Sequence, residues 1–138
     1  MPTRSSGFTL IELLVVVAVI GILSTIGLVQ YKGYVSGTKL KSAKNAMQQI
    51  LLAQTEELSN TGTYLIQKND KDSCSPTTIT SDEIEKRLFS GGDIITTDAG
   101  YDMCIYDDGD SGFRIRAVSG DKEIILTHNG LYDPVDEE

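Results

Sequence analysis

Few residues in this chain have the side-chain chemistry that catalysis or metal binding requires. His128 is the single histidine, and there is no GxSxG, phosphate-loop or Cys/His pattern. The run Asp107-Asp108-Gly109-Asp110 offers carboxylates, but it lacks the spacing and the terminal glutamate of an EF-hand calcium loop. We therefore predict no enzyme activity, no cofactor and no metal. The acidic run is interpreted as a hairpin turn, and His128 as a partly exposed residue at a strand end.

The two cysteines, Cys74 and Cys104, both lie in the polar part of the chain. Neither a CxxC motif nor a histidine cluster accompanies them, so the pair favours a disulfide over a metal site. Such a bridge would close a loop of about 31 residues and contribute about 3 to 4 kcal/mol by the chain-entropy relation.

Glu12 is the single charged residue among the 22 residues of the apolar run Phe8 to Val29. As a helix this run would reach about 33 Å, enough to cross a hydrocarbon layer of about 30 Å. It is longer than the core of a secretory signal, and no small-residue cleavage site follows it. A plain membrane anchor would explain the length but not Glu12, because an ionised carboxylate in an apolar segment is costly without a partner.

The residues around this glutamate resemble the type IV pilin family, also called class III signal or N-methylated prepilins. The resemblance rests on a short basic leader ending in Gly7, on Phe8-Thr9-Leu10-Ile11-Glu12, and on Gly21, Tyr31 and Tyr34. It implies cleavage between Gly7 and Phe8 by a membrane prepilin peptidase and methylation of the new Phe8 amine. It also implies an assembly role for Glu12, whose carboxylate would meet the Phe8 amine of a neighbouring subunit. Val29 stands where many major pilins carry a proline, so the usual kink there is not expected.

Beyond Tyr34 the pattern becomes amphipathic, with apolar residues at spacings of three or four until about Ser59, and Asn60-Thr61-Gly62 as the stop. We predict four segments: a removed leader at 1–7, an apolar membrane and filament-core helix at 8–34, its amphipathic continuation at 35–59, and a globular head at 60–138. The predicted fold class is α+β, with the C-terminal half of the long helix packed on a small antiparallel sheet.

Within the head, Thr80-Ser81-Asp82-Glu83 is interpreted as a capping box opening a short helix that ends at Gly91-Gly92. Alternating β-formers predict a three-stranded antiparallel meander and one further short strand. The expected strands are Tyr101–Tyr106, Phe113–Val118 and Glu123–His128, with the further strand at Tyr64–Ile66. The apolar side of the sheet, including Cys104 and Ile115, is expected to lie on the helix. Residues 133–138 are expected to form a solvated tail.

Charge is divided unevenly along the chain. Residues 61–138 hold 17 acidic and 7 basic side chains, a net charge of −10, whereas the first 60 residues have a net charge of +2. An acidic head argues against nucleic acid as a partner, since binding phosphates depends on Lys and Arg. We predict that Lys39, Lys41 and Lys44 meet acidic head residues of neighbouring subunits.

The resemblance therefore implies a structural subunit of a type IV pilus, polymerising through its N-terminal helix for adhesion, motility or DNA uptake. Its implied partners are other copies of itself, the prepilin peptidase, the pilus assembly machinery and, before assembly, the inner membrane. Its implied final location is the extracellular pilus. Two alternatives remain open: a type II secretion pseudopilin, which the two cysteines disfavour, and a minor pilin acting as a binding module.

Overall fold

The computed structural model describes residues 6–95 and 100–133. Most of the predicted leader and all but Asp133 of the predicted tail lie outside them. The described residues form helices α1 (Leu10–Thr61) and α2 (Thr78–Leu88) and strands β1 (Asp102–Asp107), β2 (Phe113–Ser119) and β3 (Lys122–Thr127). Contacts divide the chain into two units, Met1–Gly37 and Thr38–Glu138. The predicted α+β class, with one long helix and a small antiparallel sheet, is confirmed.

Helix α1 contains 52 residues and runs without a break through four glycines, of which Gly21 and Gly27 lie in the apolar run. Ser24 and Thr25 sit inside the apolar half, and their hydroxyls donate to the carbonyls of Ile20 and Ile22, each at 2.7 Å. The helix ends two residues later than predicted. Its stop is Gly62, whose φ of +83° is a conformation that glycine adopts without strain.

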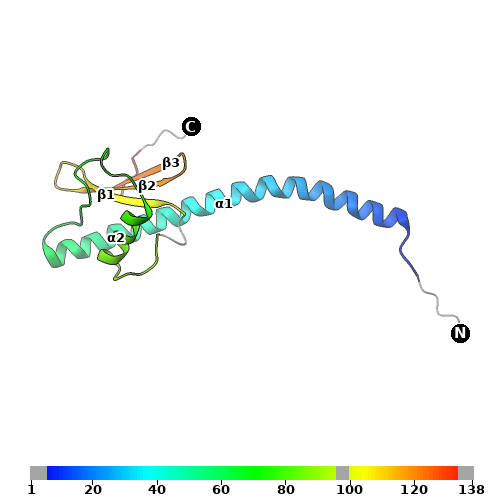
Figure 1. Cartoon of the computed structure of the whole chain (residues 1–138), viewed down its shortest axis with the longest axis horizontal. Helices are drawn as coiled ribbons and strands as arrows, with labels where there is room; N and C mark the ends of the chain where they lie inside the picture. The colour runs from blue at the N-terminus through cyan, green and yellow to red at the C-terminus, as the bar shows by residue number, and fades with distance from the viewer. Residues whose placement is uncertain (1–5, 96–99, 134–138) are drawn as a thin grey trace. The chain divides into compact units, whose positions relative to one another are not determined.

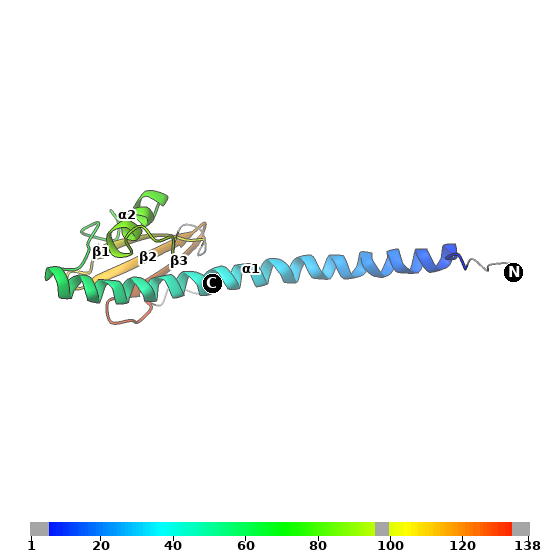
Figure 2. The same cartoon turned by 90° about the horizontal axis from the view of Figure 1, so that it is seen from below.

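The second unit is built on the amphipathic half of α1. One stripe of this half is buried, and it shares a single apolar core with the inner face of the sheet (Figures 1 and 2). The stripe consists of Ala43, Ala46, Met47, Ile50 and Gln54. From the sheet the core takes Met103, Ile105, Phe113, Ile115, Ala117, Ile124 and Leu126. Each fully buried large side chain of this kind contributes about 1.5 to 3 kcal/mol, so this packing is the main reason why the helix and the sheet fold as one unit.

The sheet has the order β1-β2-β3 with both pairs antiparallel, as the predicted meander requires. Each strand lies within one residue of its predicted position. The prediction for Ile115 was right, because this residue is fully buried in the core shared with α1. The prediction for Cys104 was wrong: alternation along β1 sends Met103 and Ile105 inward, so Cys104 points to the other face.

Two local predictions in the head were also wrong. Helix α2 begins at Thr78, two residues before the predicted capping box Thr80–Glu83. The residue that caps it is Thr77, which forms a reciprocal capping box with Thr80. Residues 64–66 form no strand. Instead the side chain of fully buried Gln54 bonds both the amide and the carbonyl of Leu65, each at 2.8 Å, which takes the groups that a strand partner would use.

Both edges of the sheet are occupied. Along β1, backbone groups of Met103 bond the hydroxyls of Thr80 and Ser81, and Ile105 bonds Gln67. Along β3, a C-terminal strap, residues 129–133, turns back onto the strand. In the strap the Leu131 carbonyl accepts from the Thr127 amide at 2.8 Å, and the Asp133 amide donates to the Ile125 carbonyl at 2.9 Å.

Candidate functional site

The start of α1 brings together the N-terminal residues that the sequence singled out. Thr9 precedes the helix, and its hydroxyl accepts a hydrogen bond from the Glu12 amide at 3.2 Å. The Glu12 carboxylate accepts in return from the Thr9 amide at 2.9 Å. This is a capping box, so in the single chain Glu12 already has a partner in its own helix. Phe8 immediately before it is 91% exposed, and Gly7 has open space around its Cα.

The apolar half of α1 buries none of its large side chains in the described chain. Phe8, Leu10, Ile11 and the following Leu, Val and Ile residues as far as Val29 are all exposed. α1 is the one described helix that is long and apolar enough to cross a membrane, with a mean hydropathy of 2.6 over its most apolar window. An apolar surface of this length needs either lipid or other helices to cover it.

The predicted bridge between Cys74 and Cys104 is present, with the two Cα atoms 5.9 Å apart. Both cysteines are fully buried and cluster with Tyr106 on the outer face of the sheet. The loop that carries Cys74 is also held by charge: Arg116 donates to the Cys74 carbonyl at 2.8 Å, and Lys71 and Arg116 both contact Glu123. The disulfide therefore fastens the loop after α1 to the sheet face that α1 does not cover.

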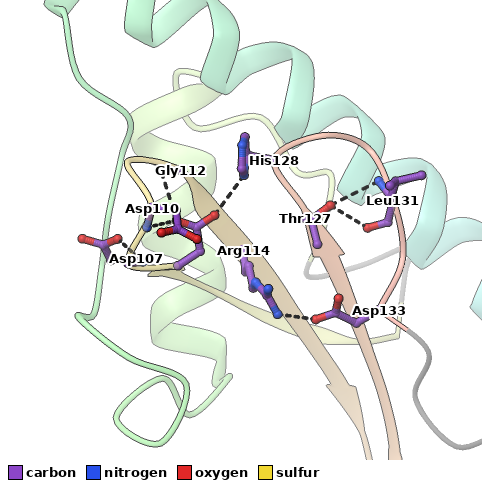
Figure 3. Close-up of polar contacts among 10 residues, drawn as sticks. Asp107, Asp110, Gly112, Arg114, Thr127, His128, Leu131 and Asp133 are labelled. Atoms are coloured by element: carbon purple, nitrogen blue, oxygen red, sulfur yellow. Dashed lines mark hydrogen bonds and ion pairs between the residues drawn. The ribbon is translucent and has the colours of Figure 1, made fainter.

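The acidic run forms the turn between β1 and β2, as predicted (Figure 3). Its carboxylates are used by its own backbone: Asp107 accepts from the Gly109 amide, and Asp108 from the amides of Asp110 and Gly112. His128, at the end of β3, places Nδ1 3.0 Å from Asp108 Oδ2 in a close charge contact without the alignment of a hydrogen bond.

These contacts hold the pKa of Asp108 below its usual value. The backbone N–H of Asp110 is the largest cause, and the Gly112 N–H and His128 also lower it, while burial opposes them. No group of three or more His, Cys, Asp or Glu side chains within residues 6–95 and 100–133 is arranged to hold a metal ion. The turn is therefore a set of carboxylates that stabilise a tight loop.

The three stem lysines differ in what they contact. The side chain of Lys39 lies against Gly100, with its Cδ 3.2 Å from where a Cβ would be. The Lys44 ammonium sits 5.0 Å above the ring of Tyr132 in the strap, whose hydroxyl also accepts from Gln48. Lys41 is exposed and makes no hydrogen bond or ion pair with described residues. Two of the three lysines thus contact their own head, and the contact of all three with acidic residues of neighbouring subunits stays a prediction.

One polar hollow of about 430 Å³ lies beside the same half of α1. Ser42, Asn45 and Gln49 of the helix line it, together with Asp93 and Ile94. Its lining therefore combines hydroxyl, amide and carboxylate groups with the aliphatic side chain of Ile94.

The residue that sequence reasoning missed is Thr9. The pattern Thr9-x-x-Glu12 is a capping-box signature, and it was available in the sequence, but Glu12 was considered only as a buried charge. Gly7, Phe8 and Glu12 lie within six residues of one another, and their proposed roles in processing and assembly stay predictions.

Comparison with known proteins identifies the class of this N-terminus. Residues 2–28 match the family model of the prokaryotic N-terminal methylation motif. The matched segment contains the capping box and almost all of the apolar run, so the start of the exposed helix is similar to that motif.

Three relatives of this chain are named as fimbrial proteins or a type IV pilin. A probable minor fimbrial protein of Dichelobacter nodosus is 37% identical over 73 residues, which cover 53% of this chain and 45% of the relative. The type IV major pilin protein PilE1 of Neisseria gonorrhoeae is 38% identical over 65 residues, covering 47% and 36%. A fimbrial protein of Neisseria meningitidis serogroup B is 38% identical over 65 residues, covering 47% and 35%.

The matches and the α+β fold support the type IV pilin family for this chain, which confirms the resemblance seen in the sequence. This family consists of structural subunits rather than enzymes. The chain spans less than half the length of these relatives. No solved structure matched the chain.

Proposed function

We propose that this chain is a structural subunit of a type IV pilus that is cleaved after Gly7, methylated on the Phe8 amine, and polymerised through α1. The observation that carries the proposal is the apolar half of α1, which is exposed along its whole length and begins with the Thr9–Glu12 capping box. The methylation motif matched over residues 2–28 supports the processing step. The precursor would be held in the inner membrane by the same helix that later forms the filament core.

Assembly is proposed to use the Glu12 carboxylate a second time. A mature chain would begin with a cationic amine at Phe8, immediately before the Thr9 cap of the first turn. In a filament the carboxylate of one subunit would meet the amine of the next within an apolar environment. An unpaired charge there would cost several kcal/mol, so correct register is favoured over incorrect register.

The test follows the fate of the N-terminus. The full-length chain is expressed with a prepilin peptidase, and filaments sheared from the cell surface are analysed by mass spectrometry. We expect a mature chain starting at a methylated Phe8 and containing the Cys74–Cys104 disulfide. Gly7→Val should block cleavage, whereas Gly27→Ala, at another open glycine of the chain, should be processed normally. Filaments whose subunits begin at Met1 would contradict the proposal.

A minor pilin is the second candidate, and the relative named as a probable minor fimbrial protein favours it. The two roles differ in abundance. In the same preparation a major subunit would dominate the protein mass, whereas a minor subunit would be a small fraction beside another pilin.

A further inference from the structure

The amphipathic half of α1 has an outer face that its own head leaves uncovered. We define the stem outer face as Lys41 and Leu52, which are both exposed. At about 100° per residue, Lys41 lies about 160° around the helix from buried Ala43, and Leu52 about 140° from buried Met47. Leu52 is 72% exposed, whereas Met47, Ile50 and Leu51 of the same half of α1 lie in the core or pack against it.

Lys41 has nothing to pair with on its own helix. The residues within four positions on either side, 37 to 45, include two further lysines and no carboxylate. Both of those lysines contact the head: aliphatic carbons of Lys39 lie beside Gly100, and the Lys44 ammonium lies over the Tyr132 ring. Lys41 is therefore the stem lysine that remains available to another molecule.

The head supplies the complementary charge in excess. Its ion pairs use Glu123, Asp133 and Asp108, while Asp72, Asp110 and Asp121 are exposed and belong to none of these pairs. From this complementarity we infer that the stem outer face docks a second copy of the chain, with Lys41 pairing with a head carboxylate and Leu52 buried beside it. The inference rests on the proposed filament, whose packed acidic heads would otherwise repel one another.

An anionic lipid surface is a poorer fit for Lys41. The residue follows Val29, the last residue of the apolar run Phe8 to Val29, by 12 positions, or about 18 Å of helix. The headgroup layer on each side of the hydrocarbon is only about 5 to 8 Å thick. Lys41 thus lies beyond the layer in which a membrane-held subunit would meet phosphate groups.

The test combines cross-linking with three matched variants of the full chain. Filaments grown from isotope-labelled and unlabelled subunits are treated with a carbodiimide, which joins a lysine to a carboxylate in contact, and linked peptides are identified by mass spectrometry. We expect Lys41 linked to an Asp or Glu of a different copy in filaments, and no such link in detergent-dispersed subunits. Lys41→Arg should keep the filament yield and lose the link, because a guanidinium does not react.

Filament yield gives the second measurement. Lys41→Gln should lower the yield of sheared filaments by about two- to fivefold, and this loss should be smaller at high salt. Lys39→Gln and Lys44→Gln should leave the cross-link pattern of Lys41 unchanged. Three results would each overturn the inference. They are a normal filament yield from Lys41→Gln, a cross-link from Lys41 to its own head, and protection of Lys41 from cross-linking by anionic vesicles but not by filaments. If the wild-type chain entered no filament at all, the proposed function would fail first, and that result is distinct from normal filaments in which Lys41 is unlinked.

Discussion

At the first turn of α1 the Glu12 carboxylate bonds the Thr9 amide, so this residue stabilises its own helix before any neighbour is present. An alanine at this position would remove both the cap and the charge, and a loss of filaments would not show which one mattered. Glutamine keeps a side-chain oxygen for the capping box and removes only the charge.

We expect Glu12→Gln to give a processed, membrane-held subunit that assembles poorly, because the charge meant for the neighbouring amine is gone. Thr9→Ala should weaken the cap by about 1 kcal/mol and assemble more nearly as the wild type does. The measurement is filament yield against the amount of mature subunit in the membrane. Normal filaments from Glu12→Gln with none from Thr9→Ala would show that the cap, and not the charge, is what assembly needs.

Asp108 provides a pH-dependent prediction for the head. Its pKa is lowered in the folded chain, so the carboxylate contributes stability that is present above its unfolded pKa, near 3.8, and is lost as the pH falls through the lower folded value. Asp108→Asn should flatten the acid side of the stability profile below about pH 4, measured by denaturant unfolding at several pH values. An acid limb identical to that of the wild type would exclude this carboxylate as a contributor.

Gly112 shows why some residues of this turn could not be predicted from the sequence. A Cβ at this position would lie 2.3 Å from His128 Nδ1 and 2.6 Å from Asp108 Oδ2. The crowding at this position comes in part from a side chain 16 positions later in the chain, and no local pattern contains that contact. The Thr9–Glu12 cap, by contrast, is a signal within four consecutive residues, and it could have been found.

At the scale of elements, the disulfide fixes a loop that has little regular structure of its own. Replacing Cys74 and Cys104 by alanine should lower the free energy of unfolding of the head by about 3 to 4 kcal/mol, the chain-entropy value for this loop length. Because both cysteines are fully buried, reductant should act slowly on the native chain and quickly in denaturant. Unfolding of the full chain in detergent, with and without reductant, measures both effects.

Gln54 joins α1 to the same loop without a covalent bond. Gln54→Leu fills the space but leaves the amide and carbonyl of Leu65 without partners, at a cost of about 1 to 3 kcal/mol for each group. Gln54→Glu keeps the acceptor for the Leu65 amide and loses the donor to the Leu65 carbonyl. If the glutamate is neutral, its loss of unfolding free energy should be smaller than that of Gln54→Leu; a buried charge would add its own cost. Unfolding midpoints of the two variants, compared with Thr55→Ala on the exposed side, give the measurement.

The elements themselves were predictable where their signals are local. Period-two alternation gave the three strands to within one residue, and Gly62 marked the end of α1. Two errors came from contacts between segments distant in the sequence. Gln54 occupies the backbone of Leu65, which prevents a strand there, and the face on which Cys104 lies depends on its register with Arg116.

At the scale of the whole molecule, the proposed filament would have to pack acidic heads close together despite their mutual repulsion. The head is strongly acidic, and Lys41 on the stem is exposed and makes no hydrogen bond or ion pair with the described residues of its own subunit. The contribution of any one exposed pair is small, about 0.2 to 1 kcal/mol, but a filament repeats it at every subunit. Filaments should therefore shear more easily as salt is raised, and Lys41→Gln should remove most of that salt dependence.

The C-terminal strap, residues 129–133, affects how the heads of neighbouring subunits could meet when they are held close together. A polymer that stacks its subunits through one helix holds the heads at a very high local concentration, where any open strand would find an identical strand beside it. In this chain Leu131 and Asp133 occupy part of the outer edge of β3, and Thr80, Ser81 and Gln67 occupy the edge of β1. In the proposed filament, neighbouring heads could then touch without merging their sheets into a continuous β-structure, and each subunit would stay folded as a separate body.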